Sequence, residues 1–183
     1  MLKEKLDRNI WITRKCRINA SDRLLKDAKY IEFLNVYYSI FVITLSLLSF
    51  VEQDSQYSFA SIVCSIALTI SIIYANATGL RERSEKLKQN YIDLQILLDQ
   101  LSLINDDEEE KILAINEKYA ELLKSTENHL EVDYFRLRRT KASDVPPMGL
   151  SEKLQWYRYL IMEFLGKATL ILAPIIGGIY LLS

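Results

Sequence analysis

The sequence predicts an all-α membrane protein with a transmembrane helical hairpin, a long cytoplasmic coiled-coil stalk and a third, C-terminal membrane helix. Three stretches of the 183-residue chain, 33–51, 55–80 and 168–183, contain no Asp, Glu, Lys or Arg. Charged residues are dense between these stretches, although the net charge of the chain is only −1. This division into charge-free and charged segments determines the predicted fold class.

The first two charge-free stretches predict a transmembrane hairpin over residues 33–80. They contain 19 and 26 residues, and a helix needs about 20 apolar residues to cross a bilayer. Two buried helices of a soluble bundle are the alternative, but the remaining residues are too few and too charged to cover them. Only the short turn Glu52–Gln56 joins the two predicted helices, so the ends of the helices away from this turn lie on the same side of the membrane.

The distribution of Lys and Arg predicts the orientation of this hairpin. Residues 1–32 carry nine such cations and residues 81–153 carry twelve, whereas the turn carries none. By the positive-inside rule, the N-terminus and the stalk are cytoplasmic, and Glu52 and Asp54 face outward. We therefore expect a multi-pass protein of the inner (cell) membrane.

The hairpin contains small and polar residues that are candidates for packing and for a pore. Small side chains recur at every fourth residue of its second helix, a pattern that allows close packing within the hairpin or between copies. No charged residue lies inside either helix, which argues against a selective transporter but leaves a pore opened by assembly. The candidates are Ala67, Ser71, Ala75 and Gly79 for helix packing, and Asn35, Ser39 and Ser46 for pore lining.

Residues 150–183 are predicted to form an amphipathic segment that becomes a membrane helix. Its charge-free part has 16 residues and contains Pro174, so a full crossing must include Glu163 and Lys167. These two residues lie four apart on one helical face, where their side chains can extend toward the interface. A third crossing with the C-terminus outside is favoured over a re-entrant or surface-lying segment.

Residues 81–141 are predicted to form a cytoplasmic helical hairpin. Apolar residues follow the alternating steps of four and three that are typical of a coiled coil, in a helix that would extend the second membrane helix to about Ile104. The hairpin is small, so its apolar faces need the N-terminal helix or other copies of the chain, which favours a homo-oligomer. The seam residues are Leu87, Tyr91, Leu94, Leu98 and Leu101.

Two segments interrupt this region. The acidic run Asn105–Glu110 predicts a turn followed by a new helix, with Asn105 or Asp106 as the N-cap. The segment 142–149 contains two prolines and is predicted to be a linker.

No arrangement of residues predicts an enzyme, a cofactor or a metal site. The single histidine, His129, is expected on a charged helical stretch without other ligands nearby. Cys16 and Cys64 are expected to be packed thiols rather than a disulfide. The basic cluster Arg136–Lys141 is expected to be solvated, with a phosphate or an anionic lipid as the alternative.

The N-terminal 32 residues are predicted to form a basic amphipathic cytoplasmic helix. Residues 11–25, WITRKCRINASDRLL, place Trp11, Ile18 and Leu25 on one helical face, and they carry four cations. Five acids accompany nine cations in residues 1–32, so we expect no direct binding of nucleic acid. A helix on the anionic inner leaflet, or packed against the stalk, fits better.

This stretch, followed by two closely spaced membrane helices and a helical tail, resembles the SLATT family of SMODS- and SLOG-associating two-transmembrane effector domains. The similarity extends through about residue 140, and the predicted third crossing departs from the two-helix pattern. The motif residues are Trp11, Arg14, Arg17, Ala20, Arg23 and Leu24.

The resemblance implies a membrane effector of a prokaryotic antiviral or conflict system. Such a protein would oligomerise to form a pore, or disrupt the inner membrane, when a partner or a nucleotide-system signal triggers it. The implied partners are the lipid bilayer, further copies of the chain and a cytoplasmic protein such as a nucleotide synthase or a reverse transcriptase. The alternative is a non-conducting membrane anchor or scaffold for a cytoplasmic partner enzyme.

Overall fold

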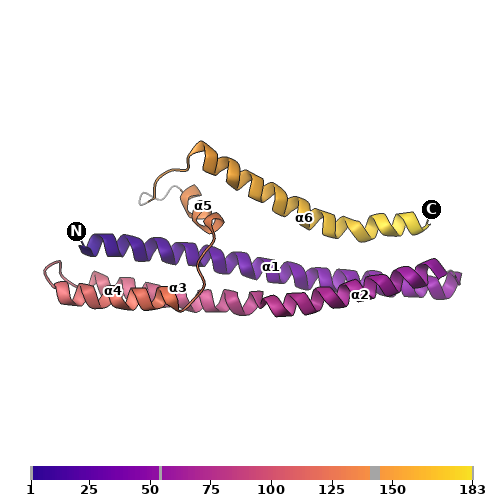
Figure 1. Ribbon diagram of the computed structural model, residues 1–183, viewed down its shortest axis with the longest axis horizontal. Helices are drawn as coiled ribbons and strands as arrows, with labels where there is room; N and C mark the ends of the chain where they lie inside the picture. The colour runs from indigo at the N-terminus through magenta and orange to yellow at the C-terminus, as the bar shows by residue number, and fades with distance from the viewer. Residues whose placement is uncertain (1, 54, 141–144, 183) are drawn as a thin grey trace. The chain divides into compact units, whose positions relative to one another are not determined.

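The computed structural model describes residues 2–53, 55–140 and 145–182, and all regular structure in these residues is helical. The predicted all-α class is thus confirmed. Of the positions for which predictions were made, Asp54, residues 141–144 and Ser183 lie outside the described residues. The helices are α1 (Leu2–Glu52), α2 (Ser55–Thr78), α3 (Leu80–Ser102), α4 (Glu109–Lys124), α5 (Glu131–Arg139) and α6 (Leu150–Leu182) (Figure 1).

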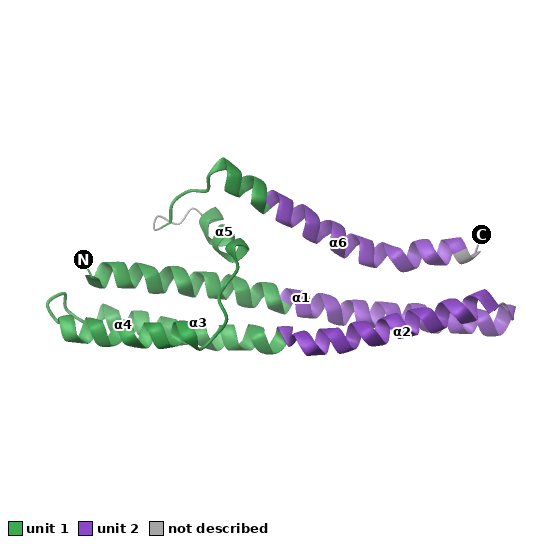
Figure 2. Cartoon of the chain, in the orientation of Figure 1, with its two compact units in different colours: residues 1–25, 81–156 green, residues 26–80, 157–183 purple. Residues whose placement is uncertain are grey.

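The chain divides into two compact units, and both α1 and α6 contribute residues to each of them (Figure 2). Unit 1 comprises residues 1–25 and 81–156, and unit 2 comprises residues 26–80 and 157–183. The three charge-free stretches therefore all lie in unit 2, whereas most of the charged residues lie in unit 1.

Unit 1 is a helical bundle in which the first turns of α1 pack against the α3–α4 hairpin. These helices share an apolar core cluster, which is the expected result of apolar stripes at helical spacing on all three helices. Trp11, Tyr119 and Leu122 lie at the edge of this core. The buried residues are Leu6 and Ile10 from α1, Leu94, Leu97, Leu98 and Leu101 from α3, and Ile112 and Ile115 from α4.

The short helix α5 covers another part of α1 in unit 1. Cys16 of α1, Leu137 of α5 and Val145 form a second buried cluster, with Trp11 and Tyr134 packed against it. The sequence left open whether the N-terminal helix or other copies of the chain cover the apolar faces of this region. In the structure α3, α4 and α5 all pack on α1, so the N-terminal helix covers them.

Unit 2 contains the helices that are long and apolar enough to cross a membrane. Three candidate spans lie in α1, in the continuous stretch Ser55–Ser102 and in α6. Their large apolar side chains face outward, as with Phe50, which is 84% exposed, and Phe59, which is 70% exposed. Hydrocarbon is the environment in which such surfaces are stable, so this pattern indicates a membrane protein rather than the core of a soluble bundle.

Two residues at the ends of these helices have a left-handed backbone conformation. Gln53, in the turn between α1 and α2, has a φ of 54°, and Gly79, between α2 and α3, has a φ of 56°. The helix resumes immediately at Leu80, so the predicted extension of the second membrane helix into the stalk is interrupted at a single residue. Gly79 is suited to this position because a residue without Cβ adopts positive φ at little cost.

Two predictions about the stalk are wrong in detail. The helix α4 begins at Glu109 with Glu108 as its N-cap, not with Asn105 or Asp106. The reason is a local turn in which the backbone N–H of Asn105 donates to the Glu108 carboxylate at 2.9 Å. The second helix of the hairpin predicted for residues 81–141 is also divided into two helices, since α4 ends at Lys124 and α5 begins at Glu131.

We predict that Gly79→Ala lowers the free energy of unfolding by about 1 kcal/mol, because a Cβ disfavours the left-handed backbone. Gly149→Ala is the matched control, since its added Cβ meets only the Glu152 carboxylate, at an ordinary contact distance of 3.6 Å. Thermal unfolding in detergent, followed by circular dichroism, measures both. Equal midpoints for the two variants would contradict the proposed role of Gly79.

Candidate functional site

Arg17 of α1 is the larger of two charged side chains in the described part of unit 1 that are only 1% exposed. Its guanidinium donates to the carbonyl oxygens of Leu122 at 3.0 Å and Leu123 at 3.3 Å. These carbonyls belong to the last turn of α4, where the backbone has no helical donors and the helix dipole is negative. Arg17 therefore caps the C-terminal end of α4.

Asn90 of α3 completes this cap. Its side-chain oxygen accepts a hydrogen bond from Arg17, and its amide donates to the Leu122 carbonyl at 2.8 Å and to the Ser125 hydroxyl at 3.0 Å. Arg17 and Asn90 thus join three helices through one set of hydrogen bonds. Burial lowers the pKa of Arg17 from its ordinary value. The Leu122 and Leu123 carbonyls act in the opposite direction, because they accept hydrogen bonds from the charged form.

A second polar contact of α1 holds α5. Arg23 forms a two-pronged ion pair with Asp133, with nitrogen–oxygen distances of 3.0 and 2.9 Å, and the Asp133 side chain is 1% exposed. The same carboxylate accepts the backbone N–H of Leu130 at 3.0 Å, at the start of α5. Asn19 donates to the Asp133 carbonyl at 2.9 Å. Asp133 therefore both caps α5 and attaches it to α1.

The motif residues predicted from the sequence lie on or beside this packed face of α1. Ala20 is 1% exposed and Leu24 is 3% exposed, while Trp11, Arg14 and Arg23 are half-buried. The most buried face passes through Ile10, Arg17 and Leu24 rather than through Trp11, Ile18 and Leu25. The sequence left open whether this helix lies on the inner leaflet or packs against the stalk. The structure places this face against α3, α4 and α5.

The predicted stalk seam also lies inside unit 1. Leu87, Leu94, Leu98 and Leu101 are buried, and Tyr91 is half-buried. At the end of the seam, Ser21 and Ser84 approach closely enough to exchange hydrogen bonds, with each hydroxyl donating to the other residue's carbonyl at 2.9 and 2.8 Å. The seam therefore faces α1 of the same chain along this length.

The cysteines and the histidine occupy structural positions. Both cysteines are free, and burial, reinforced by the Asp133 charge, raises the pKa of Cys16 to about 12. Such a thiol stays protonated and is a poor nucleophile. His129 lies in the loop between α4 and α5, so its predicted helical position is wrong, and burial lowers its pKa. No cluster of potential metal ligands occurs among the described residues.

In unit 2, three tyrosines of α1 donate hydrogen bonds to backbone carbonyls of α6. The pairs are Tyr30 to Lys167 at 2.7 Å, Tyr37 to Ile171 at 2.9 Å and Tyr38 to Leu170 at 2.8 Å. The last pair has a specific cause. Pro174 has no N–H, so the Leu170 carbonyl four residues earlier loses its helical donor. Tyr38 supplies the missing donor.

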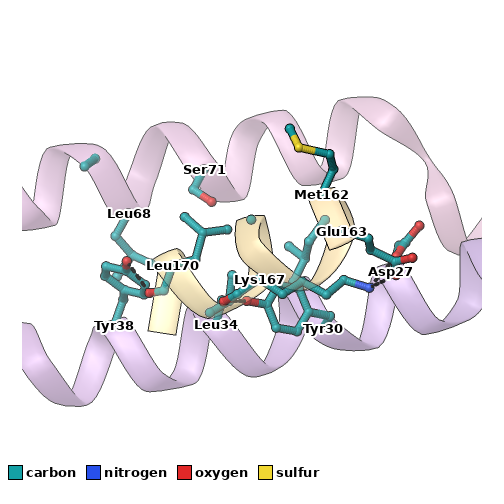
Figure 3. A pocket seen from close by; sticks show the side chains of 13 residues that line it. Asp27, Tyr30, Leu34, Tyr38, Leu68, Ser71, Met162, Glu163, Lys167 and Leu170 are labelled. Atoms are coloured by element: carbon teal, nitrogen blue, oxygen red, sulfur yellow. Dashed lines mark hydrogen bonds and ion pairs between the residues drawn. The ribbon is translucent and has the colours of Figure 1, made fainter. Parts of the chain in front are cut away.

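A charged cluster lies beside the Tyr30 contact (Figure 3). Lys167 of α6 pairs with Glu163 on the same helix, as its spacing predicts, and with Asp27 of α1 at 3.2 Å. The ammonium of Lys167 also lies 5.4 Å from the centre of the Tyr30 ring. Two carboxylates thus share one cation at the point where the charge-free stretch of α6 begins.

The candidates for pore lining and helix packing are distributed around unit 2. Asn35 is half-buried, and its carbonyl accepts the Ser39 hydroxyl at 2.7 Å. The Ser46 hydroxyl contacts its own helix and, across the hairpin, Ser61 at 2.7 Å. Of the small-residue ridge, Ala67 and Ser71 are exposed to a cavity, Ala75 is half-buried and Gly79 ends α2.

Sequence reasoning missed Asn90, Asp133, Asp27 and the tyrosines. Asn90 had a detectable signal, because it is a polar residue between seam positions Leu87 and Leu94. Pro174 in an apolar helix likewise implied a carbonyl in need of a donor. The identity of that donor depends on which α1 residue faces it, which a single sequence does not show.

The fold and these contacts define a helical membrane protein whose described polar side chains mainly join helices. Within this class, the model of SMODS and SLOG-associating 2TM effector domain family 5 matches residues 2–180. The chain belongs to this family, and the resemblance seen in its N-terminal motif is confirmed. No curated protein and no solved structure matches the chain. The match includes α6, so the third apolar helix is part of the family domain.

We predict that Arg17→Ala lowers the free energy of unfolding by about 3 kcal/mol, because it removes the buried hydrogen bonds from the guanidinium to the Leu122 and Leu123 carbonyls and to the Asn90 side-chain oxygen. Arg8→Ala, at an exposed position of the same helix, is the control and should be nearly neutral. Thermal unfolding in detergent separates the two. A midpoint for Arg17→Ala equal to that of Arg8→Ala would exclude the capping role.

We also predict that Tyr38→Phe destabilises the protein by about 1 kcal/mol more than Tyr37→Phe. The two changes are chemically identical, but only the Leu170 carbonyl has lost its helical donor to Pro174. Replacing Pro174 by Ala restores that donor, so the cost of Tyr38→Phe should fall in this background. A double-mutant cycle over Tyr38 and Pro174 measures the coupling, and additivity would refute the assignment.

Proposed function

We propose that this chain is a membrane effector of a prokaryotic antiviral or conflict system that, when triggered, oligomerises to form a pore or disrupts the inner membrane. The observation that carries the proposal is the match to an effector-domain family over residues 2–180, a range that contains three helices long and apolar enough to span a bilayer. The trigger is a partner protein or a signal from a nucleotide system, consistent with the SMODS and SLOG association of the family.

The charge distribution supports a definite orientation for this effector. Unit 1 contains most of the Lys and Arg residues, and the α1–α2 turn contains none. By the positive-inside rule, unit 1 is cytoplasmic and the turn at Gln53 is external. A cytoplasmic signal would then act on unit 1, and α1 and α6 would carry its effect because both helices continue into unit 2.

The hydroxyl groups of unit 2 suggest that the isolated chain is a closed state. Ser39, Ser46 and Ser65 each donate to a carbonyl of their own helix four residues earlier. Hydroxyls bonded in this way do not require water, so a hydrated path has to be created by assembly of several copies. The polar candidates Asn35, Ser39 and Ser46 would line this path, and the Ser46–Ser61 contact would be exchanged for water.

The second function to consider is a non-conducting anchor or scaffold for a cytoplasmic partner enzyme. The observation that favours it is the basic end of α5, where Arg136 is half-buried and Arg139 is exposed. Arg138 is unsuitable for testing this surface, because it bonds to Glu152 at 2.6 Å and to two proline carbonyls of the linker. Charge reversal at Arg136 and Arg139 tests recruitment and keeps the Arg138 contacts, and it removes one cation–π contact, in which the Arg139 guanidinium lies 5.5 Å from the centre of the Trp156 ring.

We predict that induced expression with the native neighbouring genes and trigger arrests growth and collapses the membrane potential, measured with a potential-sensitive dye. Ser46→Ala combined with Ser61→Ala should reduce depolarisation because it removes hydrophilic groups from the hairpin. Thr169→Val, at a hydroxyl bonded to its own helix in α6, is the control. If growth stops while the membrane potential stays intact, and charge reversal at Arg136 and Arg139 abolishes this growth arrest, the pore hypothesis is wrong and the scaffold hypothesis is supported.

A further inference from the structure

Helices α1, α2 and α6 of unit 2 line an open-sided cavity of about 560 Å³ (Figure 3). Its walls are mainly apolar, with Leu34 from α1, Leu68 from α2, and Met162 and Leu170 from α6 among the lining residues. A second cavity of about 390 Å³ is lined by the same three helices and shares Tyr38 with the first. Both volumes are in the range of small-molecule sites in proteins.

Small residues on two helices explain why the first cavity is open. Ala67 and Ser71 of α2 and Gly166 of α6 all line it. A Cβ placed on Gly166 would meet nothing within 4 Å, so the cavity beside Gly166 contains no protein atoms at that distance. The ridge predicted to pack helices therefore faces, at Ala67 and Ser71, a cavity rather than a neighbouring helix.

One part of the cavity lining is charged. Asp27, Glu163 and Lys167 all contribute to it, and each of their side chains is about one-third exposed. One cation faces two carboxylates, so the cluster carries a formal charge of −1. An unbalanced charge beside hydrocarbon is unfavourable, and a bound ammonium group would neutralise it.

The geometry also leaves a place for an anionic group. An ammonium side chain has three N–H donors, and Lys167 directs two of them to Asp27 and Glu163. The third is suited to a phosphate oxygen. The positions of these residues, just before the charge-free stretches of α1 and α6, place the cluster at the headgroup level of one leaflet.

We propose that this cavity binds one phospholipid with a primary-amine zwitterionic headgroup, of the phosphatidylethanolamine type. Its ammonium group contacts Asp27 and Glu163, its phosphate contacts Lys167, and an acyl chain fills the apolar cavity. A glycerol headgroup supplies no cation for the two carboxylates, and a choline headgroup has no N–H to donate to them. The proposal does not depend on pore formation.

The test uses the full chain purified in detergent and exposed to phosphatidylethanolamine, phosphatidylglycerol or phosphatidylcholine with identical acyl chains. Native mass spectrometry counts bound lipids, and competition between the lipids gives relative affinities. We expect one retained phosphatidylethanolamine per chain, with a preference of about tenfold over phosphatidylglycerol, since charged hydrogen bonds distinguish them. Equal retention of the two lipids would overturn the assignment of the headgroup.

Two variants separate the headgroup from the cavity. Asp27→Asn with Glu163→Gln keeps the side-chain shapes and should abolish the preference for phosphatidylethanolamine. Gly166→Leu fills the cavity and should reduce retention of every lipid by about tenfold. Thr169→Leu adds bulk at an exposed position of α6 and should leave retention unchanged.

Thermal unfolding of the lipid-free variants shows whether each remains folded. Unchanged retention in a folded Gly166→Leu would show that the cavity is not the lipid site. A dimer that excludes lipid would also refute the proposal, because a second copy of the chain would then occupy the cavity.

Discussion

A polar group that leaves water has to find its hydrogen-bond partner within the protein, and each unit of this chain depends on that constraint. In unit 1 the group is the Arg17 guanidinium, which is bonded to the end of α4 and to Asn90. In unit 2 it is the Leu170 carbonyl, which Pro174 deprives of its helical donor and Tyr38 satisfies. In both units the partner comes from a different helix, so the hydrogen bond also fixes the packing of helices.

The two units use α1 in different chemical ways. In unit 1 its polar side chains form ion pairs and helix caps, and they replace water as partners of polar groups on other helices. Its apolar residues pack with α3 and α4 in the bundle core. In unit 2 its tyrosines bond to α6, while its large aliphatic residues face outward. A family described by two transmembrane helices thus includes here a third apolar helix, which α1 holds by three hydroxyl groups and one ion pair.

Much of the fold could be predicted because it depends on local composition. Charge-free stretches of sufficient length predict the first two apolar helices, and a shorter stretch extended to include Glu163 and Lys167 predicts the third. The coiled-coil spacing of Leu87, Leu94 and Leu101 predicts a buried seam. Capping was less predictable, since Glu108 rather than Asn105 precedes α4, and the choice depends on a turn closed by one side chain. His129 was misplaced because the charged residues around it suit a loop as well as a helix.

The sequence by itself determined the all-helical class, which segments are apolar enough for a membrane, and the family to which the chain belongs. These properties follow from hydrophobicity, spacing and a motif, all of which are local. Only the tertiary structure decided that Arg17 caps α4, that Tyr38 serves the carbonyl freed by Pro174, and that Ala67 and Ser71 border a cavity. The physical reason is that each of these roles involves groups on helices that are distant in the sequence, and their meeting depends on how the helices pack.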